Sequence, residues 1–225
     1  METTQAEAEV VASIYAEVER RFNGVDDLAH GWEHVYRVYQ QALYIAAQEG
    51  ADRSIVALAA LMHDLGRSVP TAIGQHHADI SAALATELLS AYQVPQDKQE
   101  AILHAILAHS FSRGIEPLTL EARVVRDADR LEGLGAIGIL RWAITGTLRR
   151  TPQTRSYHPA DPFAEQHELD DSHYMLDHFY SKLLKLSDTM ATATGRALAQ
   201  RRTAFMHSYL NEMRDELQIE PDTGR

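Results

Sequence analysis

The adjacent pair His63-Asp64 is the feature of the sequence that most suggests chemistry. It follows the apolar stretch IVALAALM, so both side chains are expected to lie inside the fold. An imidazole and a carboxylate are costly to bury unless each has a partner. A metal ion could serve both groups, and a neighbouring arginine could do so in a purely structural pair. Taken alone, the dipeptide favours the structural alternative.

A polar stripe precedes this pair in the chain. Spacings of four, three and four residues place on one helical face His30, His34, Arg37 and Gln41. The stripe borders an apolar face, so it should point into a cleft rather than into bulk water. Imidazole nitrogen and carboxylate oxygen together suit a divalent metal with an open position for water and substrate.

The segment RVVRDADRLEGLG contains two further carboxylates, Asp127 and Asp129. Residues two apart on a helix point in nearly opposite directions, so at most one of them can be a ligand. Asp127 shares a face with Val124 and Leu131, whereas Asp129 shares one with Val125. Periodicity alone leaves the choice open.

Helical periodicity dominates the chain, and no strand or repeat is evident. We expect helices over residues 5–22, 26–48, 52–65 (ended by Gly66), 77–92, 96–109, 120–146, 170–187 and 193–217. The helix over 120–146 would hold three glycines that allow close packing, Gly133, Gly135 and Gly138. Residues 149–168 form a loop. We predict an all-α fold with a single domain over 1–225, comprising a metal-site core at about 26–146, this loop, and C-terminal helices at about 170–217.

Composition narrows the class of protein. The absence of cysteine excludes disulfides and thiolate metal sites and favours the reducing cytoplasm. No apolar run approaches the roughly 20 residues of a membrane span, and the acidic start METTQAEAEV is unlike a signal peptide. A net charge of −11 argues against a nucleic-acid partner. We therefore expect a cytoplasmic protein that acts on a small molecule and binds neither nucleic acid nor membrane, with its oligomeric state open.

Three segments, HGWEHVYRV, LMHDLGR and DADRLEGLGAIGI, resemble the successive signatures of the HD superfamily of metal-dependent phosphohydrolases. The later stretch LDHFYSKLLKLSDTMATATGRALAQRRTAFM resembles the C-terminal part of small bacterial HD proteins whose substrates are largely unassigned. The resemblance runs from about residue 28 to 215. It implies an HD-type helical bundle with additional C-terminal helices.

The resemblance also implies a ligand set for one divalent metal ion: His34, His63, Asp64 and Asp129. It leaves Asp127 as a structural or supporting residue. The ion could be Mn, Mg, Co, Ni, Zn or Fe, because mixed imidazole and carboxylate sites accept several. Many members have Asp directly after the first histidine of the H-x-x-x-H pair, where this chain has Gly31. That departure leaves the ligands untouched and removes any supporting carboxylate there.

Two more histidines lie where HHADISAAL and LAHSFS resemble segments of two-metal HD proteins. His77 and His109 could bind a second metal there. They could instead line the pocket and bind water or phosphate of the substrate, and this is the reading we favour.

Positive charge beside the metal would stabilise a phosphoryl transition state. Arg37 and Arg67 are the first candidates, and Arg130 adjoins Asp129; each could equally be an ordinary salt-bridge arginine. The family resemblance adds His178 and Lys182 as candidate substrate-binding residues. No role is expected of His158, His167, His173 and His207.

The resemblance implies hydrolysis of a phosphoester of a nucleotide or a related small molecule through water activated by the metal. It points to Asp64, Arg37 and Arg67 as catalytic residues. One alternative is an oxygenase with two irons bound by His34, His63, Asp64, His77, His109 and Asp129. Another is a module that senses a nucleotide without catalysis.

Overall fold

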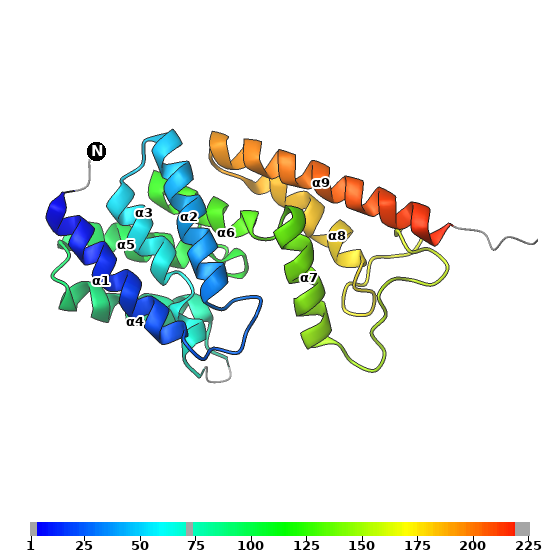
Figure 1. Ribbon diagram of the computed structural model, residues 1–225, viewed down its shortest axis with the longest axis horizontal. Coiled ribbons are helices and arrows are strands. Elements are labelled where there is room, and N and C mark those ends of the chain that lie inside the picture. Colours follow the sequence, from blue (N-terminus) through cyan, green and yellow to red (C-terminus); the bar gives the residue numbers. More distant parts are fainter. Residues whose placement is uncertain (1–3, 71–73, 219–225) are drawn as a thin grey trace, which may run out of the picture. The chain divides into compact units, whose positions relative to one another are not determined.

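The computed structural model describes residues 4–70 and 74–218 (Figure 1). Two compact units divide the chain. The first unit comprises Met1–Glu132 and Met190–Arg196, and the second comprises Gly133–Thr189 and Ala197–Arg225. The described residues are helical and contain no strand, which confirms the predicted all-α class. Among them, no helix is long and apolar enough to cross a membrane.

The first unit is built around one buried helix. Its elements are α1 (Gln5–Phe22), α2 (Trp32–Glu49), α3 (Arg53–Met62), the 3-10 turn η1 (Leu65–Ser68), α4 (His77–Ala91), α5 (Gln96–His109), the 3-10 turn η2 (Phe111–Arg113) and α6 (Leu120–Leu131). All of α3 except Arg53 and Ile55 is buried, and α3 packs against α1, α2, α5 and α6 (Figure 1). An almost wholly apolar helix can be stable in this central position because every face meets another helix.

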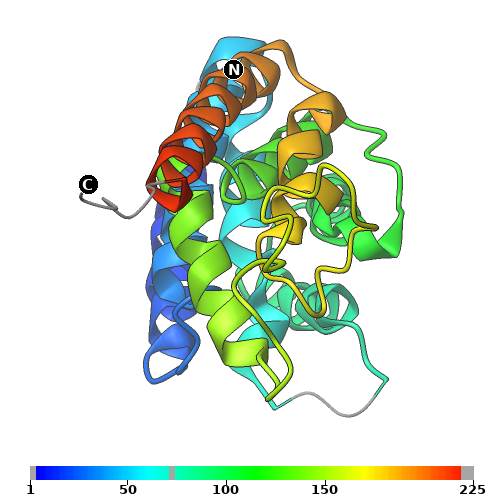
Figure 2. The same ribbon diagram turned by 90° about the vertical axis from the view of Figure 1, so that its right-hand side faces the viewer.

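The second unit contains α7 (Gly135–Arg149), α8 (Asp177–Ser181), the 3-10 turn η3 (Leu183–Thr189) and most of α9 (Ala193–Leu217). The long loop between α7 and α8 is drawn in yellow-green and yellow in Figure 2. Indole Nε1 of Trp142 donates a hydrogen bond to the carbonyl of Met175 at 2.8 Å, and its ring meets that of Phe179 edge-on at 5.0 Å. These contacts tie the end of the loop to α7.

The predicted start of the second helix is wrong. α2 begins at Trp32, after Gly31, which has extended backbone angles at the N-cap position. Residues before it form a separate turn, in which the carboxylate of Asp27 accepts hydrogen bonds from the backbone N–H groups of Ala29 and His30. Aspartate side chains compete with helix formation in this way. His30 therefore lies outside α2 and is not part of the predicted helical stripe.

Two glycine-based predictions are also wrong. α3 ends at Met62, and Gly66 lies inside η1 rather than ending the helix; a side chain there would collide with the carbonyl of His77. The predicted helix over 120–146 is two helices, because Gly135 has a left-handed φ of 70°. A Cβ at Gly138 would collide with the carbonyl of Gly133, so the close approach of the backbone at the start of α7 requires a glycine there.

The predicted helix over 170–187 is shorter than expected. α8 covers only Asp177–Ser181, and η3 continues to Thr189. Asp170 accepts hydrogen bonds from the backbone N–H groups of Ser172 and His173, which holds this segment as a turn. By contrast, α1, α5 and α9 have the predicted bounds.

Candidate metal centre

Six histidine and aspartate side chains from five segments of the first unit converge on one site. They are His34 of α2, His63 and Asp64 directly after α3, His77 at the first position of α4, His109 at the last position of α5, and Asp129 of α6. Four of these are at most 3% exposed: His34, His63, Asp64 and His109. The tight packing of α3 against its neighbours brings helix termini and helix faces together here.

The first group consists of the four ligands that the family resemblance implies. Nε2 of His34 and Nε2 of His63 are 3.3 Å apart. Oδ2 of Asp64 lies 3.7 Å from each of these nitrogens. Oδ1 of Asp129 lies 3.4 Å from Nε2 of His34 and 3.9 Å from Nε2 of His63. Within this set, the donor atoms of His34, His63 and Asp129 lie close enough together to hold a metal ion.

The second group uses the other oxygen of Asp64. Oδ1 lies 3.5 Å from Nε2 of His77 and 3.8 Å from Nε2 of His109. This oxygen is buried and accepts no hydrogen bond from the described residues. His63, Asp64 and His109 also qualify as a group that could hold a metal. Asp64 thus presents one oxygen to each of two histidine pairs.

Hydrogen bonds on the far side of the rings fix the tautomers. Nδ1 of His63 lies 2.8 Å from the carbonyl oxygen of Ala60, and Nδ1 of His109 lies 2.5 Å from that of Ile106. A carbonyl only accepts, so each Nδ1 must carry the proton. The lone pair of each Nε2 then points into the cluster, as metal ligation requires.

Glu132 supports His34 in the same way. Its carboxylate is 1% exposed and lies 3.4 Å from Nδ1 of His34. Arg37 donates from Nε to Glu132 at 2.8 Å, and Gln41 donates from Nε2 to it at 2.8 Å. Sequence reasoning missed Glu132. Its position three residues after Asp129, on the same helical face, was the available signal.

The electrostatics keep His63 and His77 neutral and Asp64 charged. Burial lowers the pKa of His63 to about 4 despite the opposing effect of Asp64, and burial likewise lowers the pKa of His77 to about 4. Burial alone would raise the pKa of Asp64, but His63 and Arg67 outweigh it and hold the pKa below its usual value. Neutral imidazoles and ionised carboxylates are the forms that bind metals.

The two arginines proposed as catalytic residues both make ion pairs. Arg67 donates from Nε to Oδ2 of Asp64 at 2.8 Å. Arg37 binds Glu132 and therefore acts on the cluster through His34. Arg130 follows Asp129, and its guanidinium carbon lies 5.5 Å from the ring centroid of Phe111. Direct contact of these arginines with substrate stays a prediction.

Asp127 and Asp129 have different surroundings. Asp127 is fully buried and accepts hydrogen bonds from the backbone N–H groups of Ala191 and Thr192 and from the Thr192 hydroxyl. It therefore anchors the segment before α9 and does not reach the cluster. His30 pairs with Asp27 at 3.0 Å.

The remaining candidates belong to the second unit. Nδ1 of His178 lies 2.7 Å from Asp171, and the substrate-binding roles of His178 and Lys182 stay predictions. His167, for which no role was expected, lies between two carboxylates: Nδ1 is 2.8 Å from Asp161 and Nε2 is 2.9 Å from Asp177. It is therefore an organising residue of the long loop rather than an ordinary loop histidine.

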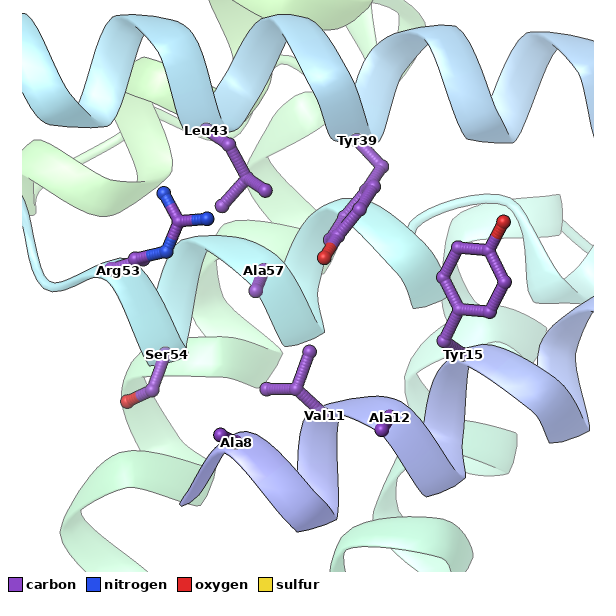
Figure 3. Close-up of a pocket in the computed structure, with 9 residues that line it drawn as sticks. All are labelled: Ala8, Val11, Ala12, Tyr15, Tyr39, Leu43, Arg53, Ser54 and Ala57. Carbon is purple, nitrogen blue, oxygen red and sulfur yellow. The ribbon is translucent and has the colours of Figure 1, made fainter. Parts of the chain in front are cut away.

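An open groove of about 420 Å³ lies elsewhere on the first unit (Figure 3). Its walls come from α1, α2 and α3 and include Val11, Tyr39 and Leu43, with Arg53 at one end. None of the clustered histidines or aspartates lines it. The groove is therefore separate from the candidate metal centre.

The clustered side chains lie in a region that is similar to a known protein family. The family model for the HD domain matches residues 31–134, a span that contains all of the clustered side chains. The Bacillus subtilis protein YpgQ is 34% identical over 195 residues, covering 84% of this chain and 84% of YpgQ. The crystal structure of YpgQ in complex with ADP has a TM-score of 0.72 at 30% identity and covers 94% of this chain and 97% of that one.

A crystal structure of an HD-superfamily hydrolase from Bacillus thuringiensis is also similar. Its TM-score is 0.73 at 27% identity, covering 95% of this chain and 100% of that one. The match to the HD domain coincides with the histidine and aspartate cluster, and the similarity to YpgQ extends over most of both chains. The chain therefore belongs to the HD superfamily.

Proposed function

We propose that the protein is a metal-dependent phosphohydrolase that cleaves a phosphoester of a nucleotide or a related small molecule. The observation that carries the proposal is the position of Asp64, whose two oxygens each face a pair of imidazole nitrogens at 3.5 to 3.8 Å. Membership of a superfamily that includes hydrolases supports metal-dependent hydrolysis in general.

The residues present suit divalent metal ions. Oδ1 of Asp64 is a buried acceptor without a hydrogen bond from the described residues, and a cation between Asp64 and His109 would satisfy it. His34, His63, Asp64 and Asp129 would hold one ion, and Asp64, His77 and His109 would contribute to a second. When bound, such ions lower the pKa of a coordinated water and polarise a phosphoryl oxygen.

Neighbouring side chains of the protein would orient the metal ligands and balance their charge. Glu132 fixes the ring of His34, and Arg67 holds Asp64 through the hydrogen bond to Oδ2. Arg67 is 30% exposed, so its guanidinium could also meet the phosphoryl group of a substrate. A nucleotide is the preferred substrate class because the similar protein YpgQ was crystallised with ADP.

A phosphatase screen with defined divalent metals tests this function. Wild type should release phosphate from at least one nucleotide, whereas Asp64→Ala should lose both bound metal and turnover. Asp97→Ala is the matched control, because Asp97 is an exposed aspartate of α5. Metal binding without hydrolysis of any phosphoester in a broad panel would favour the nucleotide-sensing alternative.

The same side chains also suit a second reaction class. The position of His77 and His109 beside Oδ1 of Asp64 supports a di-iron oxygenase as the alternative, since these two histidines would complete its six ligands. Iron content and oxygen uptake separate the two functions. Two irons per chain with substrate-dependent consumption of O₂ would replace hydrolysis as the function.

A further inference from the structure

Two arginines lie one helical turn apart beside Asp129. Arg126, Asp129 and Arg130 are at positions i, i+3 and i+4 of α6, which places them on the same side of the helix. The Asp129 side chain is 26% exposed, whereas its cluster partner His34 is 1% exposed. Asp129 is therefore at the open edge of the metal centre, and the two arginines lie next to that edge.

The guanidinium of Arg126 is not held by any described carboxylate. Its Nε atom is buried and has no hydrogen-bond partner there, and Arg126 makes no ion pair with any described carboxylate. Burying a guanidinium donor without an acceptor costs free energy. Arg126 as a whole is partly exposed, so an anion from outside the protein can approach its guanidinium although Nε itself is enclosed.

Arg130 is held by an aromatic ring. Its guanidinium carbon lies 5.5 Å from the ring centroid of Phe111, a residue that is 59% exposed. Stacking of this kind uses the flat face of the guanidinium, whereas phosphate oxygens bind at its N–H edge. Phe111 comes two residues after His109, one of the clustered histidines.

We propose that Arg126 and Arg130 form an anion subsite that binds a second phosphoryl group of the substrate, adjacent to the one at the metal centre. This inference rests on the proposed phosphohydrolase function and narrows its substrate class to compounds with at least two linked phosphoryl groups, such as a nucleoside diphosphate. Two guanidinium groups one helical turn apart repel each other. A doubly charged phosphoryl group between them would attract both and offset that repulsion.

Calorimetric titration of the Mn²⁺-loaded protein tests the subsite without turnover. The probes are inorganic phosphate and methylenediphosphonate, whose P–C–P linkage resists hydrolysis. Arg126→Gln should weaken binding of methylenediphosphonate roughly ten- to hundredfold, while binding of phosphate changes less than about twofold. Arg126→Lys, which keeps the charge but loses the forked geometry, should fall between wild type and Arg126→Gln.

Arg123→Gln is the matched control. Arg123 is an exposed residue of the same helix and donates from Nε to the carbonyl of Pro117, so its loss removes the same charge away from the subsite. The control should bind both probes like wild type. Thermal melting and metal content of every variant must match wild type, which separates loss of a subsite from loss of the fold.

The outcomes distinguish the subsite from the function on which it rests. Equal weakening of both probes by Arg126→Gln, or no weakening of either, overturns the subsite. A wild type that binds phosphate and hydrolyses phosphoesters but does not prefer methylenediphosphonate overturns the subsite and leaves the phosphohydrolase intact. A metal-loaded wild type that binds neither probe contradicts both.

Discussion

The carboxylate of Glu132 lies 3.4 Å from Nδ1 of His34, and both side chains are 1% exposed. Arg37 and Gln41 donate hydrogen bonds to the same carboxylate, so it cannot rotate away from the imidazole. A fixed acceptor on one side of the ring directs the lone pair of Nε2 to the other side. Glu132 is therefore a positioning residue for the metal centre.

Replacement of Glu132 should weaken metal binding without removing a ligand. We expect Glu132→Gln to reduce metal affinity roughly 10- to 100-fold, the usual effect of losing an outer partner of a ligating histidine. Calorimetric titration with Mn²⁺ measures this. Glu19→Gln, at an exposed position of α1, should bind metal like wild type. Unchanged affinity in Glu132→Gln would show that His34 needs no such support.

The second histidine pair should determine metal stoichiometry. We expect wild type to hold two ions per chain after dialysis, and His77→Ala to hold one, because His77 faces only Oδ1 of Asp64. Elemental analysis or native mass spectrometry counts the ions. His104→Ala is the control, since His104 accepts a hydrogen bond from the backbone of Leu118 outside the cluster. A wild type with a single ion would contradict the two-metal geometry.

Asp127 and Asp129 should have opposite mutant phenotypes. Asp127→Ala leaves the backbone N–H groups of Ala191 and Thr192 without their buried acceptor, so it should lower the free energy of unfolding by about 3 kcal/mol. Asp129→Ala should instead lose metal while the metal-free protein keeps its stability. Denaturant unfolding and metal titration of both variants check this. If folded Asp127→Ala lost as much metal as Asp129→Ala, the choice of Asp129 over Asp127 as the ligand would be wrong.

The stabilising contribution of His167 to the fold should decrease as the pH rises. Hydrogen bonds to Asp161 and then to Asp177 raise the pKa of His167 above its usual value. A raised pKa stabilises the fold most below the unfolded-state pKa of about 6.5, and this contribution is lost as pH rises through the folded-state pKa. The melting temperature of wild type should therefore exceed that of His167→Gln more at about pH 6 than at about pH 9.

The control for this pH dependence is His207→Gln, at an exposed position of α9. Its melting temperature should differ from that of wild type by the same amount at both pH values. A stabilising contribution of His167 that grows with pH would mean that the imidazole is neutral between the two carboxylates.

Local patterns predicted most of the helices, and the errors have local causes. α5 follows Pro95 and α9 follows Thr192. Both helices show clear helical periodicity up to their last residues, so their bounds were predictable. The start of α2 was not, because the side chain of Asp27 holds a separate turn before Gly31. The break after α6 depends on the backbone conformation of Gly135, which residue spacing does not reveal.

The convergence of the site was predictable only in part. Residue patterns placed His34, His63 and Asp64 in a cleft, and the family resemblance selected Asp129 over Asp127. The direction of the Arg37 side chain was not readable, because its partner Glu132 lies 95 residues away in the chain. The division of Asp64 between two histidine pairs likewise arises from the packing of α3, α4 and α5 rather than from any single segment.

Anomalous diffraction from crystals grown with Mn²⁺ tests the central claim most directly. The account predicts one strong peak among His34, His63, Asp64 and Asp129, and a second on the other side of Asp64 near His77 and His109. Well-ordered crystals in which these imidazoles and carboxylates carry no peak, while manganese binds at another site, would contradict it.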